Sequence, residues 1–228
     1  MIARYLRSGG RVPPPDAESL EIADDGTFVM WRSVHSPLVG RFEGRLEGDS
    51  LRVLEQEVAA AAAAGPLQRH PVPDAARESI EAGGALATLG HPDRVDGPWA
   101  PVVIRLRSLL DALVGHPLAA LELTVSRDAR SARLAHRGER PLRADLSDLS
   151  VRAVLWGRDY VKLDDWRSDA TSGGPHEVTT DRGWTYPLPF DHGFAVGTDS
   201  VIHVYASFVL IEDASRIGVL AVRAPGLP

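Results

Sequence analysis

The chain contains no cysteine, no asparagine and a single lysine, Lys162, among its 228 residues. Without cysteine it can form no disulfide, no thiolate nucleophile and no cysteine-bound zinc or iron–sulfur centre. Without asparagine it has no N-glycosylation acceptor, and turns that need a positive φ must use glycine or aspartate. We attribute the shortage of asparagine and lysine to the codon bias of a GC-rich bacterial genome. We expect a cytoplasmic location, with which a cysteine-free chain is compatible.

Long apolar runs and an excess of positive charge are missing as well. No stretch reaches the roughly 20 apolar residues that cross a bilayer, and the N-terminus lacks the apolar run of a signal peptide. The net charge of -6 and the pI of about 5.7 disfavour a nucleic-acid binder, which needs a basic face. We therefore expect neither a membrane nor a nucleic acid as partner.

The compact motifs of common catalytic sites are also absent from the sequence, which has no HExxH, no G-x-S-x-G, no G-x-G-x-x-G and no Walker-type phosphate loop. Ser8 and Ser172 stand before Gly-Gly pairs, as turn serines do. His91 and His116 stand in Gly-His-Pro, which is typical of solvated turn histidines. We predict no catalytic residues, no metal ligands and no cofactor.

Two other histidines leave an enzymatic alternative open. His192 lies in Asp191-His192-Gly193, and His203 lies on an expected strand. If these residues met a further carboxylate in one pocket, the chain would be a hydrolase-type enzyme with a dispersed His/Asp site, with or without a metal. A strand histidine is more often satisfied by a neighbour, and the sequence does not show whether the two converge.

What the chain does have is enough apolar residues, 44%, to bury the core of one large or two small domains. In the first half, two hairpins are predicted around Asp24-Asp25-Gly26 and Gly83-Gly84. Helices are predicted over 50–64 and 100–114, because apolar residues recur there at spacings of three and four and glycine with a nearby proline follows. The predicted strands of this half are 2–6, 20–23, 27–32, 38–46, 78–81 and 85–89.

From Leu118 onward the apolar pattern has period two and no helix is predicted, which favours a β-sandwich. We expect the run 201–210 to be a central strand paired with 217–222, and 167–183 to be a long loop or insertion. The proline-rich segment 184–190 is expected to be an edge strand or a loop. The predicted fold class is α+β, with an α+β domain of hairpins closed by two helices over 1–115 and a β-sandwich-like domain over 116–228.

Five tryptophans and the arginines beside them are candidates for either the core or an interface. Burial is the default for tryptophan because its ring hides a large apolar area. The pairs Trp31-Arg32 and Trp166-Arg167 would suit an interaction hot spot if they were exposed. The sequence does not decide the exposure of any tryptophan.

Residues 1–115 resemble emfourin, a family of small bacterial proteins that inhibit thermolysin-type metalloproteases. The resemblance rests on an opening strand that runs into Arg7-Ser8-Gly9-Gly10, an extended segment, the helix from Leu51 to Ala64, the hairpin at Gly83-Gly84 and the helix from Pro101 to Leu113. It implies a protease as partner. Residues 116–228 are similar in outline to immunoglobulin-like interaction domains.

These observations favour a non-catalytic binding protein, either a proteinase inhibitor or another protein-interaction module. An inhibitor needs a preorganised loop, and three consecutive prolines restrict the segment 8–15. A subunit of a larger assembly is a third possibility, and the oligomeric state stays open. The predicted binding residues are Arg7, Ser8, Gly9, Gly10, Trp31 and Arg32.

Overall fold

The computed structural model describes residues 1–9, 16–32, 37–69, 76–113, 116–126, 130–157, 162–169, 175–178, 183–188, 201–210 and 216–223. Strands make up most of this part of the chain, together with two α-helices, so the predicted α+β class is confirmed. The residues divide into two compact units. Unit 1 comprises Met1–Arg32 and Arg41–Leu118, and unit 2 comprises Ser33–Gly40 and Ala119–Pro228.

Unit 1 contains one sheet with strands in the order β4-β3-β2-β1-β6-β7-β5. The central strand β1 is antiparallel to both β2 and β6, while β5 pairs with β7 in parallel. The strands of this sheet are β1 (Ala3–Gly9), β2 (Asp16–Ile22), β3 (Thr27–Arg32), β4 (Leu38–Arg45), β5 (Leu67–Gln68), β6 (Arg77–Ala82) and β7 (Ala85–Gly90), and β4 belongs to unit 1 from Arg41 onward.

Both predicted hairpins form, and glycine sits in each where the backbone requires it. Gly26 has a φ of 82° at the β2–β3 turn, and Gly83 and Gly84 have φ values of 56° and 82° between β6 and β7. Two successive residues with positive φ match the right-handed twist of a two-residue hairpin. These turns fix the registers that bring specific side chains together on each face of the sheet.

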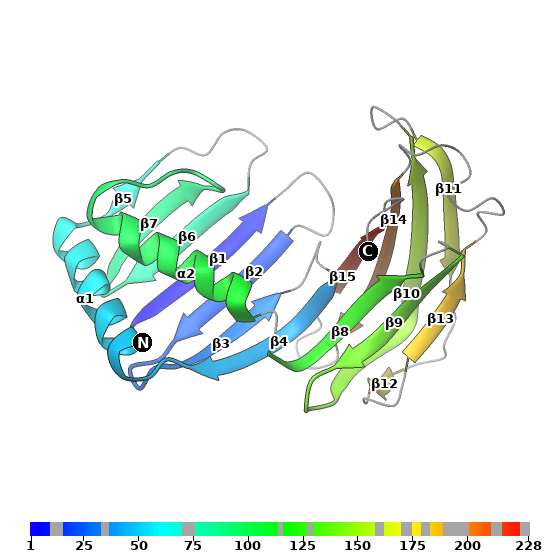
Figure 1. The fold of residues 1–228 in the computed structure, drawn as a ribbon, viewed down its shortest axis with the longest axis horizontal. Helices are drawn as coiled ribbons and strands as arrows, with labels where there is room; N and C mark the ends of the chain where they lie inside the picture. Colours follow the sequence, from blue (N-terminus) through cyan, green and yellow to red (C-terminus); the bar gives the residue numbers. More distant parts are fainter. Residues whose placement is uncertain are drawn as a thin grey trace. The chain divides into compact units, whose positions relative to one another are not determined.

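Two helices lie over the same face of this sheet (Figure 1), which we call the covered face. They are α1 (Gly48–Ala64) and α2 (Ala100–Ala112), the second preceded by a 3-10 turn, η1 (Gly97–Trp99). The indole Nε1 of Trp99 donates to the carbonyl of Gly65, 2.9 Å away, and so ties η1 to the end of α1. Leu54 and Val58 of α1, and Leu106 and Leu110 of α2, are buried, as their helical spacing predicts.

The opposite side of the unit 1 sheet, which we call the open face, carries the alternate residues of each strand. On the covered face Tyr5, Leu20 and Ile80 are fully buried. On the open face Leu6 is 38% exposed and Leu86 is 50% exposed. This contrast within single strands defines the two faces.

Unit 2 is made of strands throughout its described residues. One group, β13-β9-β8, has β13 at its outer end, where an edge strand was predicted. A second sheet has the order β11-β10-β14-β15, with β12 also paired to β10. The strands are β8 (Pro117–Val125), β9 (Ser131–Arg137), β10 (Leu142–Trp156), β11 (Lys162–Asp169), β12 (Pro175–Val178), β13 (Gly183–Pro187), β14 (Val201–Leu210) and β15 (Arg216–Arg223).

Two predictions for unit 2 have clear outcomes. The pairing of 201–210 with 217–222 is confirmed, because β14 and β15 are antiparallel partners. The prediction of one long loop over 167–183 is wrong, because β11 continues to Asp169 and β12 pairs with the beginning of β10. These short polar strands have little apolar alternation of their own, and their pairing with β10 determines their conformation.

Candidate functional site

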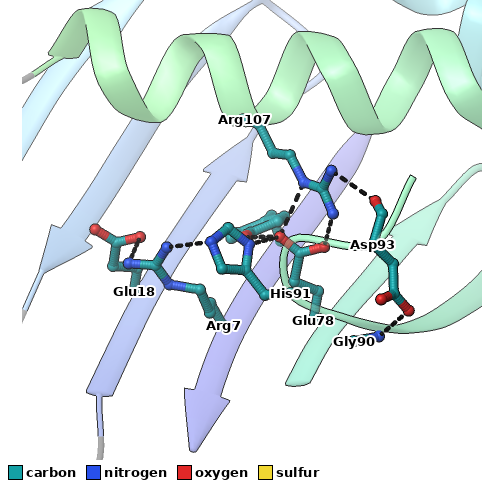
Figure 2. A network of polar contacts seen from close by, with 8 residues as sticks. Arg7, Glu18, Glu78, Gly90, His91, Asp93 and Arg107 are labelled. Atoms are coloured by element: carbon teal, nitrogen blue, oxygen red, sulfur yellow. Dashed lines mark hydrogen bonds and ion pairs between the residues drawn. The ribbon is translucent and has the colours of Figure 1, made fainter. Parts of the chain in front are cut away.

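The most connected group of polar side chains lies in unit 1, between the covered face and α2 (Figure 2). Its centre is the carboxylate of Glu78 on β6, which is fully buried. Oε1 of Glu78 accepts hydrogen bonds from the hydroxyl of Tyr5 at 2.6 Å, Nδ1 of His91 at 2.7 Å and Nε of Arg107 at 3.0 Å. The other oxygen, Oε2, accepts from Nη2 of Arg107. Four donors therefore neutralise and saturate this carboxylate.

A second carboxylate, Glu18 on β2, forms the other half of the network. It is 4% exposed and pairs with Nη2 of Arg7 at 2.7 Å and with Nε of Arg32. Arg32 also donates to the carbonyl of Leu110 on α2, 3.5 Å away. The two halves meet where Nη1 of Arg7 lies 3.2 Å from Nε2 of His91.

The turn after β7 holds His91 in place. Its backbone N–H donates to the carbonyl of Ala76 at 2.7 Å. Two residues later, Asp93 accepts the N–H of Gly90 with its side chain at 3.0 Å and an N–H of Arg107 with its backbone carbonyl, also at 3.0 Å. The turn and α2 are therefore joined by bonds that do not involve the imidazole.

The electrostatics of the site favour the charge states that the hydrogen bonds require. Burial raises the pKa of Glu78, but the hydrogen bonds from Arg107, Tyr5 and His91 outweigh burial and lower that pKa below its ordinary value. Burial, together with the hydrogen bond to Glu78, raises the pKa of Tyr5 far above that of a free phenol. Glu78 thus stays ionised and Tyr5 stays protonated at neutral pH. Because the carboxylate of Glu78 already accepts four hydrogen bonds and Tyr5 keeps its proton, neither group is poised for proton transfer. The hydrogen bonds between Arg107 and Glu78 instead fasten α2 to the sheet.

The structure separates the predicted binding residues between the two faces. Arg7 and Arg32 lie on the covered face and share the carboxylate of Glu18. Ser8 and Trp31 occupy the alternate, open-face positions of β1 and β3, and Trp31 is half-buried. Gly9 ends β1 with a φ of 104°, whereas Gly10 lies outside the described residues.

Neither carboxylate of the network was predicted from the sequence. Glu18 stands two residues before Leu20, and Glu78 two residues before Ile80. Alternate residues of a strand share a face. Glu18 therefore lies on the same buried face as Leu20, and Glu78 on the same buried face as Ile80. That period-two signal was available in the sequence.

In unit 2 the histidine singled out from the sequence, His203 on β14, belongs to a small aromatic cluster. Its ring lies edge-on to Trp156 with centroids 6.0 Å apart, and its Nδ1 is 3.2 Å from the hydroxyl of Tyr205. Burial lowers the pKa of His203, which favours the neutral ring. His192 and Asp191 lie outside the described residues. Within the described part of the chain, no three His, Asp or Glu residues are grouped as a metal site would need.

Comparisons with known proteins add little to this picture. No family model and no curated protein matches the chain. A solved structure of a β-glucuronidase from Parabacteroides merdae matches with 10% identity and a TM-score of 0.19, over 97% of this chain and 26% of that one. This chain therefore spans about a quarter of that enzyme's length, and so low a score carries no argument about fold or activity. Among the described helices, none is both long and apolar enough to cross a membrane.

Proposed function

We propose that this chain is a non-catalytic protein-binding module and that the open face of unit 1 is its binding surface. The observation that carries the proposal is the exposure of three large apolar side chains on that one face: Leu6 at 38%, Val29 at 36% and Leu86 at 50%. The covered face of the same sheet, by contrast, is closed by helices and by a saturated ionic network. Large apolar side chains exposed on one face, among polar residues, are a feature of interaction sites.

The strand registers place these residues in two adjacent rows. Leu6 lies opposite Ser19, which in turn lies opposite Trp31, so a tryptophan and a leucine flank a small residue in one row. Directly opposed residues of antiparallel strands share a face. In the next row Val29, Glu21, Arg4, Glu81 and Leu86 follow one another across β3, β2, β1, β6 and β7.

Charges of both signs among these rows favour a protein as the partner. Arg4 and Glu21 form an exposed ion pair at 3.1 Å, and Glu81 and Arg77 are exposed on β6. A nucleic acid would require a predominantly basic face, whereas protein interfaces combine an apolar centre with a mixed polar rim. The open face of unit 1 combines apolar side chains with charges of both signs, which fits a protein partner better than a nucleic acid.

Proteinase inhibition is the more specific form of this proposal, with a thermolysin-type metalloprotease as the partner. The resemblance of residues 1–115 to emfourin motivates it, and Ser8 and Trp31 of the predicted binding set belong to the open face. Of the segment 8–15, Ser8 and Gly9 end β1, and residues 10–15 lie outside the described part of the chain.

Titration of purified protein against a panel of metalloproteases tests the inhibitor form. We expect residual activity to fall with added wild-type protein, and Trp31→Ala to weaken inhibition by about tenfold, as loss of an interface tryptophan does. A variant with a Gly/Ser linker in place of residues 8–15 shows how much of the inhibition comes from that segment and how much from the open face of unit 1. Undiminished protease activity at stoichiometric excess of wild-type protein would contradict this form of the proposal.

We make two further proposals, one about the packing of unit 2 and one about the location of the protein in the cell. We propose that the strands of unit 2 pack as a sandwich, supported by the buried series Val151, Ala153 and Leu155 on β10 and by buried Leu121 and Leu123 on β8. We also propose a cytoplasmic location in a bacterial cell, supported by the cysteine-free composition.

A further inference from the structure

We infer that His91 is a proton-sensitive latch that joins the two halves of the ionic network only while its imidazole is neutral. The inference rests on the contacts of the two ring nitrogens. Nε2 lies 3.2 Å from Nη1 of Arg7, and Nδ1 lies 2.7 Å from Oε1 of Glu78. A guanidinium can only donate hydrogen bonds, so Nε2 of His91 must accept. Nδ1 therefore carries the proton and donates it to the carboxylate.

Protonation of His91 removes the acceptor that this arrangement needs. With a proton on each nitrogen, the N–H at Nε2 would face an N–H of Arg7, and two positive charges would meet at the same point. The contact to Glu78 persists, because Nδ1 donates in either state. Acidification of the solution supplies the second proton.

The groups around the imidazole determine which contact opens. Arg7 keeps its pair with Glu18 at 2.7 Å, and Glu78 keeps its bonds from Tyr5 and Arg107. The bridge between Arg7 and His91 is then the contact that is lost. The titratable and charged groups of the network around His91 are Arg7 from β1, Glu18 from β2, Glu78 from β6, Arg107 from α2 and Asp93 from its own turn (Figure 2). Tyr5 from β1 joins them through its hydrogen bond to Glu78.

Arg7 is the residue that loses a hydrogen-bond acceptor when its contact with His91 breaks. Its side chain is 25% exposed, and its Nε is buried without a hydrogen-bond partner, so Glu18 would be the remaining anchor among its described contacts. Arg7 lies between Leu6 and Ser8, two residues of the open face. Proton uptake on the covered face would therefore remove one side-chain contact of Arg7, whose chain neighbours lie on the open face, while β1 stays paired with β2 and β6.

A second histidine gives an internal reference for the protonation pattern. Nε2 of His136 lies 2.7 Å from the backbone carbonyl of Arg140. Because a carbonyl can only accept, His136 must carry its proton on Nε2, the reverse of His91. One molecule thus holds two buried or half-buried histidines with opposite tautomers.

Nitrogen-15 NMR of the imidazole rings near neutral pH is the first test. We expect the Nδ1–H form at His91 and the Nε2–H form at His136 in the same sample. An Nε2–H or doubly protonated His91 at neutral pH would overturn the inference, because neither form can accept from Arg7. Assignment is made by comparison with His91→Gln.

Hydrogen exchange at two pH values tests the consequence. Between about pH 7.5 and about pH 5.5, after correction for intrinsic exchange, we expect the Nη protons of Arg7 to exchange about fivefold faster. The amides of Gly90 and His91 should keep their protection, because their hydrogen bonds do not involve the imidazole. His91→Gln can both donate and accept without titrating, so the acid effect should disappear. His116→Gln, at an exposed site, should keep it. An unchanged acid effect in His91→Gln, or none in the wild type, would contradict the latch.

Discussion

Glu78, Glu18 and Arg32 are charged residues that occupy core positions of β-strands. Burying a charge is costly unless partners and hydrogen bonds compensate for the lost water. In this network each buried charge has an opposite charge beside it, and Glu78 has four donors. The arrangement fixes where α2 sits, because Arg107 and Arg32 attach two points of that helix to the sheet.

Removing the central charge should therefore cost far more than removing a surface charge. We expect Glu78→Gln to lower the free energy of unfolding by about 3 kcal/mol, since it leaves Arg107 facing a neutral group in a buried site. Glu21→Gln breaks an exposed pair with Arg4 and should cost less than about 0.5 kcal/mol. Urea unfolding of the two variants beside the wild type measures both values. Equal losses would show that the network contributes no more than a surface ion pair.

The pH dependence of stability follows from the lowered pKa of Glu78. A carboxyl whose pKa is lower in the folded than in the unfolded state stabilises the fold above the unfolded value of about 4.3, and this contribution is lost as the pH falls through the folded pKa. Wild type should thus lose stability in acid more steeply than Glu78→Gln. Urea midpoints measured from neutral pH down to about pH 3 should converge for the two proteins. A constant gap between them would contradict the assignment.

At the scale of elements, the sequence predicted most of unit 1 because each element there carries a local signal. The helix 50–64 and both hairpins appear with small shifts of their ends, since caps and glycine turns are encoded within a few residues.

Strand β10 shows why the strands of unit 2 were harder to predict. Buried positions are even-numbered at Leu142 and Ala144 but odd-numbered at Val151 and Ala153. The register of β10 against β14 shifts between Asp145 and Ser150, so no single period-two pattern runs through the whole strand.

The two hairpin glycines make a matched test at this scale. A Cβ on Gly26 would lie 2.3 Å from the carbonyl oxygen of Leu46, whereas a Cβ on Gly84 would meet nothing within 4 Å. Both positions have a φ of 82°. We expect Gly84→Ala to cost about 1 kcal/mol from backbone conformation alone, and Gly26→Ala to cost at least about 2 kcal/mol more, because the clash is with backbone. Thermal unfolding of the two variants decides. Similar melting temperatures would mean that the β2–β3 turn can shift away from Leu46.

At the scale of the whole molecule, composition and patterning predicted an α+β chain but not which surfaces are free. Arg7 and Ser8 were predicted from the motif that resembles emfourin, and Trp31 and Arg32 as a pair suited to a hot spot. The sequence could not show that Glu18 pairs with both arginines. Trp31 and Ser8 lie on the open face. Neighbouring residues of a strand point to opposite faces of the sheet. A shift of one residue along the strand therefore decides whether a side chain lies on the covered face, beneath α2, or on the open face.

The most direct measurement for the central claim is the affinity of two charged variants for a thermolysin-type metalloprotease, determined by calorimetric titration beside the wild type. Leu6→Glu puts a charge in the middle of the open face, and Ile104→Glu puts the same charge at an exposed apolar site on α2, where Ile104 is 61% exposed. The account predicts that wild type and Ile104→Glu bind alike and that Leu6→Glu binds at least about tenfold more weakly. Equal affinities for all three proteins, or no binding by the wild type, would contradict it.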